Sequence, residues 1–334
     1  MRVLSGIQPT GTLHIGNYFG AIEQWVELQK KTTRLAGEAG TIFIIVDLHA
    51  ITIDYDPKKM QKNILGAAMD YLAAGLNPKK CIIFIQSQIK EHTELAWLLQ
   101  VITPISELER MTQFKEKSKQ YKANINAGLF TYPILMAADI LLYKTNIVPV
   151  GEDQRQHVEL ARTIARKFNN KFGKVFSLPK TQLPKFGARI MSLNNPTQKM
   201  SKSFGPQSYI ALSDSPNIIR EKIKRAVTDS GKEIKYDLKK KPAISNLLTI
   251  CHLFSKKSIK ELEKKYKNRG YAEFKKDLAE VIIKGLEPFQ EKRKKYEKSP
   301  RLVKKILAEG AKKAQKIAKE TIREVKTKMG LIQA

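Results

Sequence analysis

The sequence is poor in cysteine and in acidic residues, and it has no long hydrophobic run. Only two of its 334 residues are cysteines, Cys81 and Cys251, and they stand far apart without a CxxC spacing. This pattern excludes a cysteine-rich zinc or iron–sulfur site and suits a reducing compartment. No apolar run approaches the roughly 18 residues that a membrane-spanning helix needs. We therefore expect a cytoplasmic protein without a membrane partner.

The scarcity of acidic residues leaves a strong positive charge. There are 61 lysines and arginines against 32 aspartates and glutamates, which gives a formal net charge of +29. Such a surface attracts polyanions, and nucleic acid is the usual one. A lysine-rich composition can also reflect biased codon usage, so the charge alone does not identify the partner.

Apolar runs and helical stretches alternate in the first half of the chain. Residues 42–46, 82–85 and 146–150 read as strands buried on both faces, and residues 3–5 as a shorter first strand. Helical patterns separate them at residues 57–75, 91–108, 131–143 and 153–168. This alternation predicts an α/β fold with a doubly wound parallel (Rossmann-like) sheet. Ligands bind at the carboxyl ends of such strands, so we expect a site in the loops after Ser5, Val46 and Val150.

The composition changes after about residue 205, where the chain becomes helical and rich in lysine. We expect a catalytic domain over residues 1–200 and an α-helical domain over residues 201–334. A last helix is predicted from Ser299-Pro300 to Gly330, with the last helices packing back on the first domain. The segment 87–145 is longer than a single crossover helix, and we expect it to have a function of its own.

Two short motifs indicate phosphate chemistry. Near the N-terminus the chain reads Gly6-Ile-Gln8-Pro9-Thr10-Gly11-Thr-Leu-His14-Ile-Gly16-Asn17. Glycines at a strand-to-helix turn let the backbone approach a ligand, and the helix start offers free N–H groups to phosphate. His14 and Asn17 add donors that can stabilise charge during in-line attack at phosphorus. Taken alone, this motif also fits a polar turn with a chance histidine.

The second motif is Lys199-Met200-Ser201-Lys202-Ser203, in a loop bounded by Pro196 and by Gly205-Pro206. Two ammonium groups on flexible stems can close onto pyrophosphate as it leaves. The alternative is a solvated basic loop.

In this order, the two motifs resemble the two ATP-binding signatures of class I aminoacyl-tRNA synthetases, and the segments between them resemble the tryptophanyl-tRNA synthetases. The resemblance covers essentially the whole chain. It implies activation of L-tryptophan with ATP to tryptophanyl-AMP, then transfer of tryptophan to the 3′-terminal adenosine of tRNA(Trp). It also implies Mg²⁺ carried by the ATP phosphates, a homodimer formed through the insert at about 87–145, and an anticodon-binding role for the helical domain. The family pattern His-Ile-Gly-His ends here in Asn17, as is usual in tryptophanyl enzymes.

The segment Tyr132-Pro133-Ile-Leu-Met136-Ala-Ala-Asp139 predicts a helix with Pro133 at its first position. Tyr132, Met136 and Asp139 then share one face. Burying the Asp139 carboxylate is costly unless a group donates to it, and an indole N–H is only a donor. An exposed aspartate on an amphipathic helix is the alternative. Related tyrosyl enzymes usually have glutamine where Met136 stands, which favours tryptophan.

The resemblance assigns further roles residue by residue. Gly151 to Asp153 would hold the ribose of ATP, although Asp153 also suits a helix N-cap. Ile190, in Ala188-Arg-Ile190, would contact adenine through its backbone. Lys117 would approach the ATP phosphates, although on its own the sequence shows only a basic amphipathic segment there. The histidines His49, His92, His157 and His252 have no metal-ligand spacing and are expected to be structural.

These assignments define the predicted site. The expected catalytic residues are His14, Asn17, Lys117, Lys199 and Lys202. The expected ATP-binding residues are Gln8, Pro9, Thr10, Gly16, Asn17, Gly151, Glu152, Asp153, Ile190, Lys199, Met200, Ser201, Lys202 and Ser203. The expected tryptophan-binding residues are Tyr132, Met136, Asp139 and Gln154. No dedicated metal site is expected.

Three alternatives remain from the sequence. A tyrosyl-tRNA synthetase would share the chemistry and differ in the amino acid. A small-molecule adenylyltransferase would share the His-Ile-Gly turn but would not need the basic helical third. A non-catalytic RNA-binding protein could keep only the scaffold, and the intact His14, Lys199, Lys202 and Asp139 argue against it.

Overall fold

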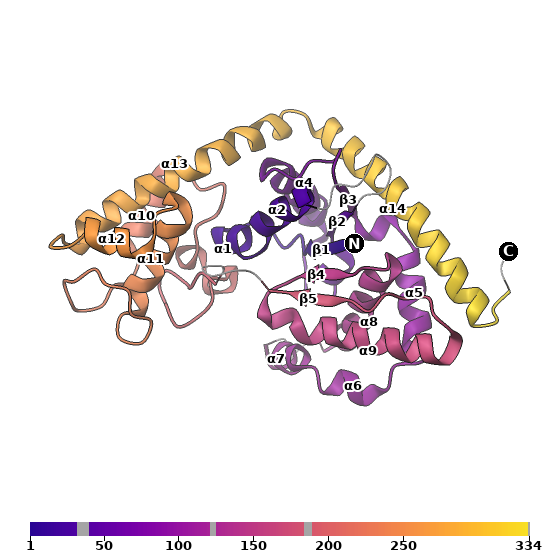
Figure 1. Ribbon diagram of the computed structural model, residues 1–334. Helices are drawn as coiled ribbons and strands as arrows, with labels where there is room; N and C mark the ends of the chain where they lie inside the picture. Colours follow the sequence, from indigo (N-terminus) through magenta and orange to yellow (C-terminus); the bar gives the residue numbers. More distant parts are fainter. Residues whose placement is uncertain (32–39, 121–124, 184–188, 333–334) are drawn as a thin grey trace. The chain divides into compact units, whose positions relative to one another are not determined.

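The computed structural model describes residues 1–31, 40–120, 125–183 and 189–332 (Figure 1). The chain forms two compact units, and it enters each of them more than once. Unit 1 comprises residues 1–11, 25–183 and 299–334, and unit 2 comprises residues 12–24 and 184–298.

Unit 1 is built on a parallel sheet, which confirms the predicted α/β class. Its described strands are β1 (Val3–Ile7), β2 (Thr41–Ile45), β3 (Ile82–Ile85), β4 (Ile147–Pro149) and β5 (Lys180–Gln182), in the order β3-β2-β1-β4-β5. The first four coincide with the predicted apolar runs, and β2 is buried along its whole length. The sequence did not indicate β5, because this strand has only three residues and all of them are polar.

The order of the strands creates a switch point between β1 and β4. The chain continues from β1 to β2 on one side, whereas β4 lies on the other side of β1. The Ser5 hydroxyl ties the two central strands together by donating to Pro149 O at 2.8 Å. The polar segments 8–11 and 151–154 follow these two strands, at the position where ligands bind in open α/β sheets.

The described helices of unit 1 are α3 (Asp47–Ala50), α4 (Pro57–Ala73), α5 (Glu91–Gln100), α6 (Ile105–Glu109), α7 (Thr112–Gln120), α8 (Ala127–Leu142), α9 (Arg155–Phe172) and α14 (Pro300–Lys328). The helix α2 (Glu23–Lys31) begins in unit 2 and continues into unit 1. Short 3₁₀ turns, η2 (Gln86–Gln88) and η3 (Glu152–Gln154), follow β3 and β4.

The four predicted helices of this unit all differ in their bounds from the observed ones, and two of the differences have a local cause. The helix expected over 91–108 is divided into α5 and α6, because Pro104 disfavours helical backbone at the residue before it. The prediction of Pro133 at a first helical position is wrong, since α8 begins six residues earlier, at Ala127. The Asn126 side chain caps α8 by accepting from Leu129 N at 2.9 Å, and this cap places the start there.

The helix α14 packs along β3, an edge strand of the sheet (Figure 1). Gly310 makes this approach possible, because a Cβ at this position would lie 1.9 Å from Ile83 O. The helix begins at Pro300 and stops before Gly330, whose φ of 77° suits glycine, as the sequence predicted. Its position protects the backbone of β3 from pairing with another chain.

Unit 2 is mainly helical in its described part. It contains α1 (Ile15–Asn17), the π-helical turn η1 (Tyr18–Ile22), η4 (Lys202–Phe204), η5 (Pro206–Ser208), α10 (Pro216–Arg225), α11 (Pro242–Ser255), α12 (Ile259–Lys265) and α13 (Tyr271–Glu297). The helices α10 and α11 both pack on α13, around buried Phe274, Leu278 and Ile282. In the described residues of either unit, no helix combines the length and the apolar character needed to cross a membrane.

Candidate active site

The two sequence motifs come together in unit 2. His14 pairs with Ala211 in an antiparallel bridge, and Ile15 N donates to Ile210 O at 3.0 Å. A Cβ at Gly16 would lie 2.9 Å from the His14 imidazole and 3.6 Å from Met200 Cβ. The turn that carries Gly16 therefore lies beside the second motif, and the glycine leaves room for the His14 imidazole.

His14 is a buried, neutral side chain. Its exposed fraction is 6%, and burial together with the positive charges of Lys202 and Lys199 lowers its pKa from 6.5 to about 3. Its Nδ1 has no hydrogen-bond partner among the described residues. A neutral imidazole can donate a hydrogen bond to a phosphate oxygen without carrying charge itself.

Asn17 and the lysine loop belong to the same region of unit 2. Asn17 Oδ1 accepts from His14 N at 3.1 Å, which directs the polar side chain toward the turn. Met200 is buried and its N–H donates to Ile190 O at 3.0 Å, whereas Lys199 is exposed. The Ser208 hydroxyl lies 2.7 Å from both Ser201 O and Gly205 O. The loop is therefore held at Met200 and Ser208.

Asn246 of α11 also belongs to this region, although no sequence motif indicated it. Its Oδ1 accepts from Met191 N at 2.9 Å, and its Nδ2 donates to Met191 O at 3.0 Å. It thereby fixes the backbone next to Ile190, the residue expected to contact adenine. The sequence does contain a clue to this role. Asn246 is an amide within the mainly apolar helical segment 242–250, and a polar side chain buried there needs hydrogen-bond partners.

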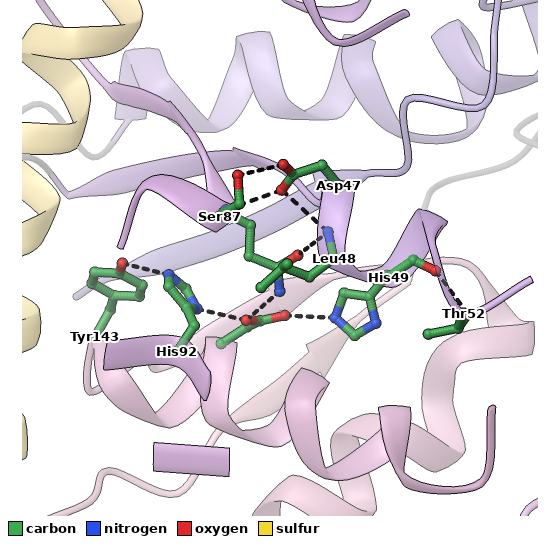
Figure 2. A network of polar contacts seen from close by, with 9 residues as sticks. Asp47, Leu48, His49, Thr52, Ser87, His92 and Tyr143 are labelled. Carbon is green, nitrogen blue, oxygen red and sulfur yellow. Dashed lines mark hydrogen bonds and ion pairs between the residues drawn. The ribbon is translucent and has the colours of Figure 1, made fainter. Parts of the chain in front are cut away.

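Asp139 accepts hydrogen bonds from three side chains of a polar network in unit 1. Figure 2 shows this network, with His49, His92 and Tyr143 among its labelled residues. Asp139 Oδ1 accepts from Gln86 Nε2 at 2.7 Å and from His92 Nδ1 at 2.6 Å, and Asp139 Oδ2 accepts from His49 Nε2 at 2.8 Å. His92 Nε2 in turn lies 2.8 Å from the Tyr143 hydroxyl. The donors come from α3, η2 and α5, which follow the strands β2 and β3.

The network keeps Asp139 ionised. Burial opposes the charged form, since the exposed fraction is 3%, but the hydrogen bonds from His49 and His92 outweigh it and lower the pKa from 3.8 to about 2. The alternative of an exposed aspartate is therefore wrong. An ionised carboxylate has about four acceptor positions. Three are occupied by described residues, and the remaining one is on Oδ2.

A second carboxylate supports these donors. Asp47 Oδ1 accepts from Leu48 N at 3.1 Å and from Ser87 N at 3.0 Å, and Asp47 Oδ2 accepts from Ser87 Oγ at 2.5 Å. Gln86 Oε1 accepts from Leu48 N at 3.2 Å, so its other end is oriented toward Asp139. The carboxyl ends of β2 and β3 are thereby joined.

The other predicted amino-acid contacts lie in the same unit. Tyr132 is buried, its hydroxyl lies 3.0 Å from His157 Nε2, and its ring meets His49 edge-on with centroids 6.1 Å apart. Met136 is half-buried, one turn before Asp139 on α8. Gln154 Nε2 donates to Asp153 Oδ2 at 2.9 Å, which orients both side chains after β4.

Most of the remaining predicted residues follow the ends of two strands in unit 1. Gln8, Pro9 and Thr10 follow β1, and Gly151 to Asp153 follow β4, with Glu152 exposed. The helix α9 begins after Gln154, so the Asp153 side chain is not its N-cap. The side chain of Lys117 and residue Ala188 lie outside the described residues. Within the described ranges, no three His, Cys, Asp or Glu side chains are grouped to hold a metal ion.

The chain matches known proteins over almost its whole length. The family model for class I tRNA synthetases (W and Y) matches residues 1–287. The tryptophan–tRNA ligase of Caldanaerobacter subterraneus subsp. tengcongensis is 53% identical over 332 residues, with 99% of this chain and 98% of the relative covered. That of Bacillus subtilis is 49% identical over 330 residues, covering 98% and 97%.

A solved structure of the same enzyme type has a fold similar to that of this chain. The tryptophanyl-tRNA synthetase of Campylobacter jejuni, complexed with ADP and tryptophan, has a TM-score of 0.84 and 40% identity, covering 99% of this chain and 100% of that one. The chain is a class I tRNA synthetase by fold and sequence. Within that class, it belongs to the tryptophan–tRNA ligases.

Proposed function

We propose that this chain joins L-tryptophan to tRNA(Trp) in two steps. The tryptophan carboxylate attacks the α-phosphorus of ATP, which forms tryptophanyl-AMP and releases pyrophosphate. A ribose hydroxyl of the 3′-terminal adenosine of the tRNA then attacks the acyl carbon and releases AMP. The nucleophile of the first step is already ionised, so catalysis consists of positioning and charge stabilisation.

The proposed ATP site uses both motifs. His14 and Asn17 donate to the α-phosphate as charge builds there, and Lys199 and Lys202 neutralise the departing pyrophosphate. The closeness of Gly16 to Met200, whose Cβ would lie 3.6 Å from a Cβ at Gly16, supports this assignment. Gly151 to Asp153 bind the ribose, and the remaining ATP contacts are those expected at Gln8, Pro9, Thr10, Lys117, Ile190, Ser201 and Ser203. Mg²⁺ enters bound to the triphosphate, because it prefers phosphate oxygens and retains several waters.

The amino-acid pocket uses the free acceptor position of Asp139. An indole N–H can donate to Oδ2, which already accepts from His49. Tyr132 and Met136 provide apolar surface for the indole ring, and Gln154 binds the polar end of the amino acid. The single observation that carries this assignment is the buried, ionised Asp139 with one acceptor position left. This site suits a donor-only heterocycle.

The partners are tRNA(Trp) and a second copy of this chain. The net charge of +29 supports binding of a polyanion. Trp97, Val101 and Ile105 recur every four residues from α5 into α6 and are 65%, 61% and 65% exposed. Large exposed apolar side chains grouped in this segment support a dimer interface within the insert. The reaction is expected to take place in the cytoplasm.

The test is amino-acid-dependent exchange of pyrophosphate into ATP, with all twenty amino acids in parallel. We expect exchange with tryptophan alone, and loss of exchange in a Lys202→Met variant that still melts cooperatively. Exchange with tyrosine would retain the class and overturn the amino-acid assignment. Absence of exchange with every amino acid, in folded protein with Mg²⁺, would favour the non-catalytic alternative.

Oligomeric state provides a separate test. Light scattering after gel filtration should give a dimer for the unchanged protein and a monomer for Trp97→Glu. A monomeric unchanged protein would contradict the proposed interface.

A further inference from the structure

The two oxygens of Asp139 are not equivalent. Oδ1 accepts two hydrogen bonds, from Gln86 and His92, whereas Oδ2 accepts one, from His49. His49 belongs to α3, directly after β2, at the edge of the sheet where ligands bind. The open acceptor position therefore lies on the oxygen next to the ligand-binding edge. The protein donors to Oδ1 determine which oxygen remains available.

His92 is fixed from both ends. Its Nδ1 faces a carboxylate, which only accepts, so Nδ1 carries hydrogen. Its Nε2 lies 2.8 Å from the hydroxyl of Tyr143, which can supply the hydrogen of that second bond. Burial and the nearby Asp139 and Glu91 charges raise the pKa of Tyr143 well above its ordinary value, so this phenol keeps its proton.

The surroundings leave this pair no freedom to turn. His92 and Tyr143 are both fully buried, their ring centroids lie 5.5 Å apart, and both rings lie within 5.9 Å of Phe84. Figure 2 shows the bond between His92 and Tyr143, and the other ring nitrogen of His92 bonds to Asp139. A side chain packed and hydrogen-bonded in this way retains one rotamer and one tautomer.

We propose that His92, supported by Tyr143, is a positioning residue for amino-acid selection. Together with Gln86 it occupies Oδ1, so that the acceptor position of Asp139 left open by the described residues is on Oδ2 and faces the indole N–H of the substrate. A ring without N–H leaves that position unpaired. A tyrosine hydroxyl can donate to it but brings acceptor lone pairs of its own. This inference rests on the proposed function, because it refines the recognition of tryptophan at the same site.

The test compares tryptophan with 3-(benzothien-3-yl)-L-alanine, in which sulfur replaces the ring N–H. The variants are His92→Leu, which removes the donor, His92→Asn, whose amide can replace Nδ1–H, and Tyr143→Phe, which removes one hydroxyl and retains the ring. Pyrophosphate exchange gives kcat/KM for each amino acid, and KM for ATP is measured in parallel.

We expect His92→Leu to lower kcat/KM for tryptophan about 100-fold and for the analogue less than about 3-fold, because only tryptophan uses the oriented acceptor. Tyr143→Phe should lower the tryptophan value about 5-fold to 10-fold, and His92→Asn should restore part of the loss in His92→Leu. KM for ATP should stay unchanged in all three. If His92→Leu does not fold, Tyr143→Phe still gives the ratio of the two substrates.

The matched control is Tyr266→Phe in unit 2, which removes another buried hydroxyl bonded to a carboxylate, that of Asp277. It should leave the ratio of the two substrates unchanged. Equal losses for tryptophan and the analogue in the Tyr143 and His92 variants would mean a merely structural role and would overturn the proposal. Absence of tryptophan-dependent exchange by the unchanged protein would instead contradict the proposed function, and this inference with it.

Discussion

The side-chain amide of Asn246 makes two hydrogen bonds with one residue, Met191, accepting from its N–H at 2.9 Å and donating to its carbonyl at 3.0 Å. This pairing imitates a short β-bridge and links α11 to the segment that contains Ile190. Ile190 O in turn accepts from Met200 N, in the lysine loop. One buried amide therefore stabilises two neighbouring parts of the proposed ATP site.

Replacing Asn246 by leucine should weaken ATP binding. Both backbone groups of Met191 would lose their partners, at a cost of about 1–3 kcal/mol in the free energy of unfolding. KM for ATP should rise about 10-fold in the exchange assay, with KM for tryptophan unchanged. Asn169→Leu is the matched control, because Asn169 bonds both backbone groups of Phe176 in unit 1. It should destabilise the fold and leave KM for ATP as it was. An unchanged KM for ATP in the Asn246 variant would contradict its role.

Asp139→Asn should abolish most tryptophan activation while ATP binding is retained. The amide would present hydrogens toward His49, Gln86 or His92, which all donate to this position. Loss of a buried acceptor for a substrate donor lowers kcat/KM by about 100-fold or more. Pyrophosphate exchange measures the first effect, and equilibrium dialysis with labelled ATP measures the second. Normal kinetics with tryptophan would remove Asp139 from the pocket.

His14 should make stability depend on pH. The folded protein does not protonate His14 until the pH falls to about 3, whereas the unfolded chain does so near its ordinary pKa of 6.5. The unfolded state therefore binds more protons between these values, and His14 lowers the stability as the pH falls through this window. Urea unfolding at pH 6.5 and pH 4.5 should show His14→Gln losing less stability on acidification than the unchanged protein. The two proteins can differ by at most about 1.4 kcal/mol per pH unit in the stability that they lose. Parallel losses in the two proteins would show that His14 is not buried in its neutral form.

Gly310→Ala should destabilise unit 1. The new Cβ would lie 1.9 Å from Ile83 O, so α14 would have to move away from β3. We expect a loss of about 2–4 kcal/mol in the free energy of unfolding, as for other overpacked sites. Gly270→Ala is the control, because a Cβ there meets no atom within 4 Å and its φ is −78°. A Gly310 variant with unchanged unfolding would mean that α14 does not pack closely on β3.

Affinity for tRNA should fall steeply with salt. Lysines and arginines that neutralise phosphates release counterions, and the logarithm of the association constant then falls linearly with the logarithm of the salt concentration. With about six phosphate contacts, we expect a loss of roughly 10³-fold between about 50 and 200 mM salt. Filter binding with tRNA(Trp) over a salt titration measures this slope. A flat titration would assign the excess of lysine to composition rather than to RNA binding.

The sequence predicted the strands that can be recognised from their own residues, without knowledge of their neighbours. The apolar runs that became β1 to β4 are long enough to indicate buried strands, whereas β5 is short and polar and is recognised only by its pairing with β4. The start of α8 was misplaced because a preference for proline at a first helical position is weaker than a hydrogen-bonded cap at Asn126.

The donors of Asp139 were missed for a different reason. His49, Gln86 and His92 lie far from Asp139 in sequence, and no spacing rule connects them. The histidines were expected to be structural because they lack a metal-ligand pattern. Their positions could have indicated a role in the site, since His49 and Gln86 directly follow the carboxyl ends of neighbouring parallel strands. Which donor reaches which oxygen depends on packing that only the fold determines.

The helix α14 is synthesised long after the strand that it covers. The ribosome completes β3 at Ile85, but Pro300 and the helix that covers this strand emerge only after residues 86–299 have been synthesised. During that interval the unpaired edge of β3 lacks its cover and can pair with another chain. A stall or a truncation between Gln182 and Ser299 should therefore yield nascent chains that need a chaperone, even though all five strands of the sheet have been synthesised.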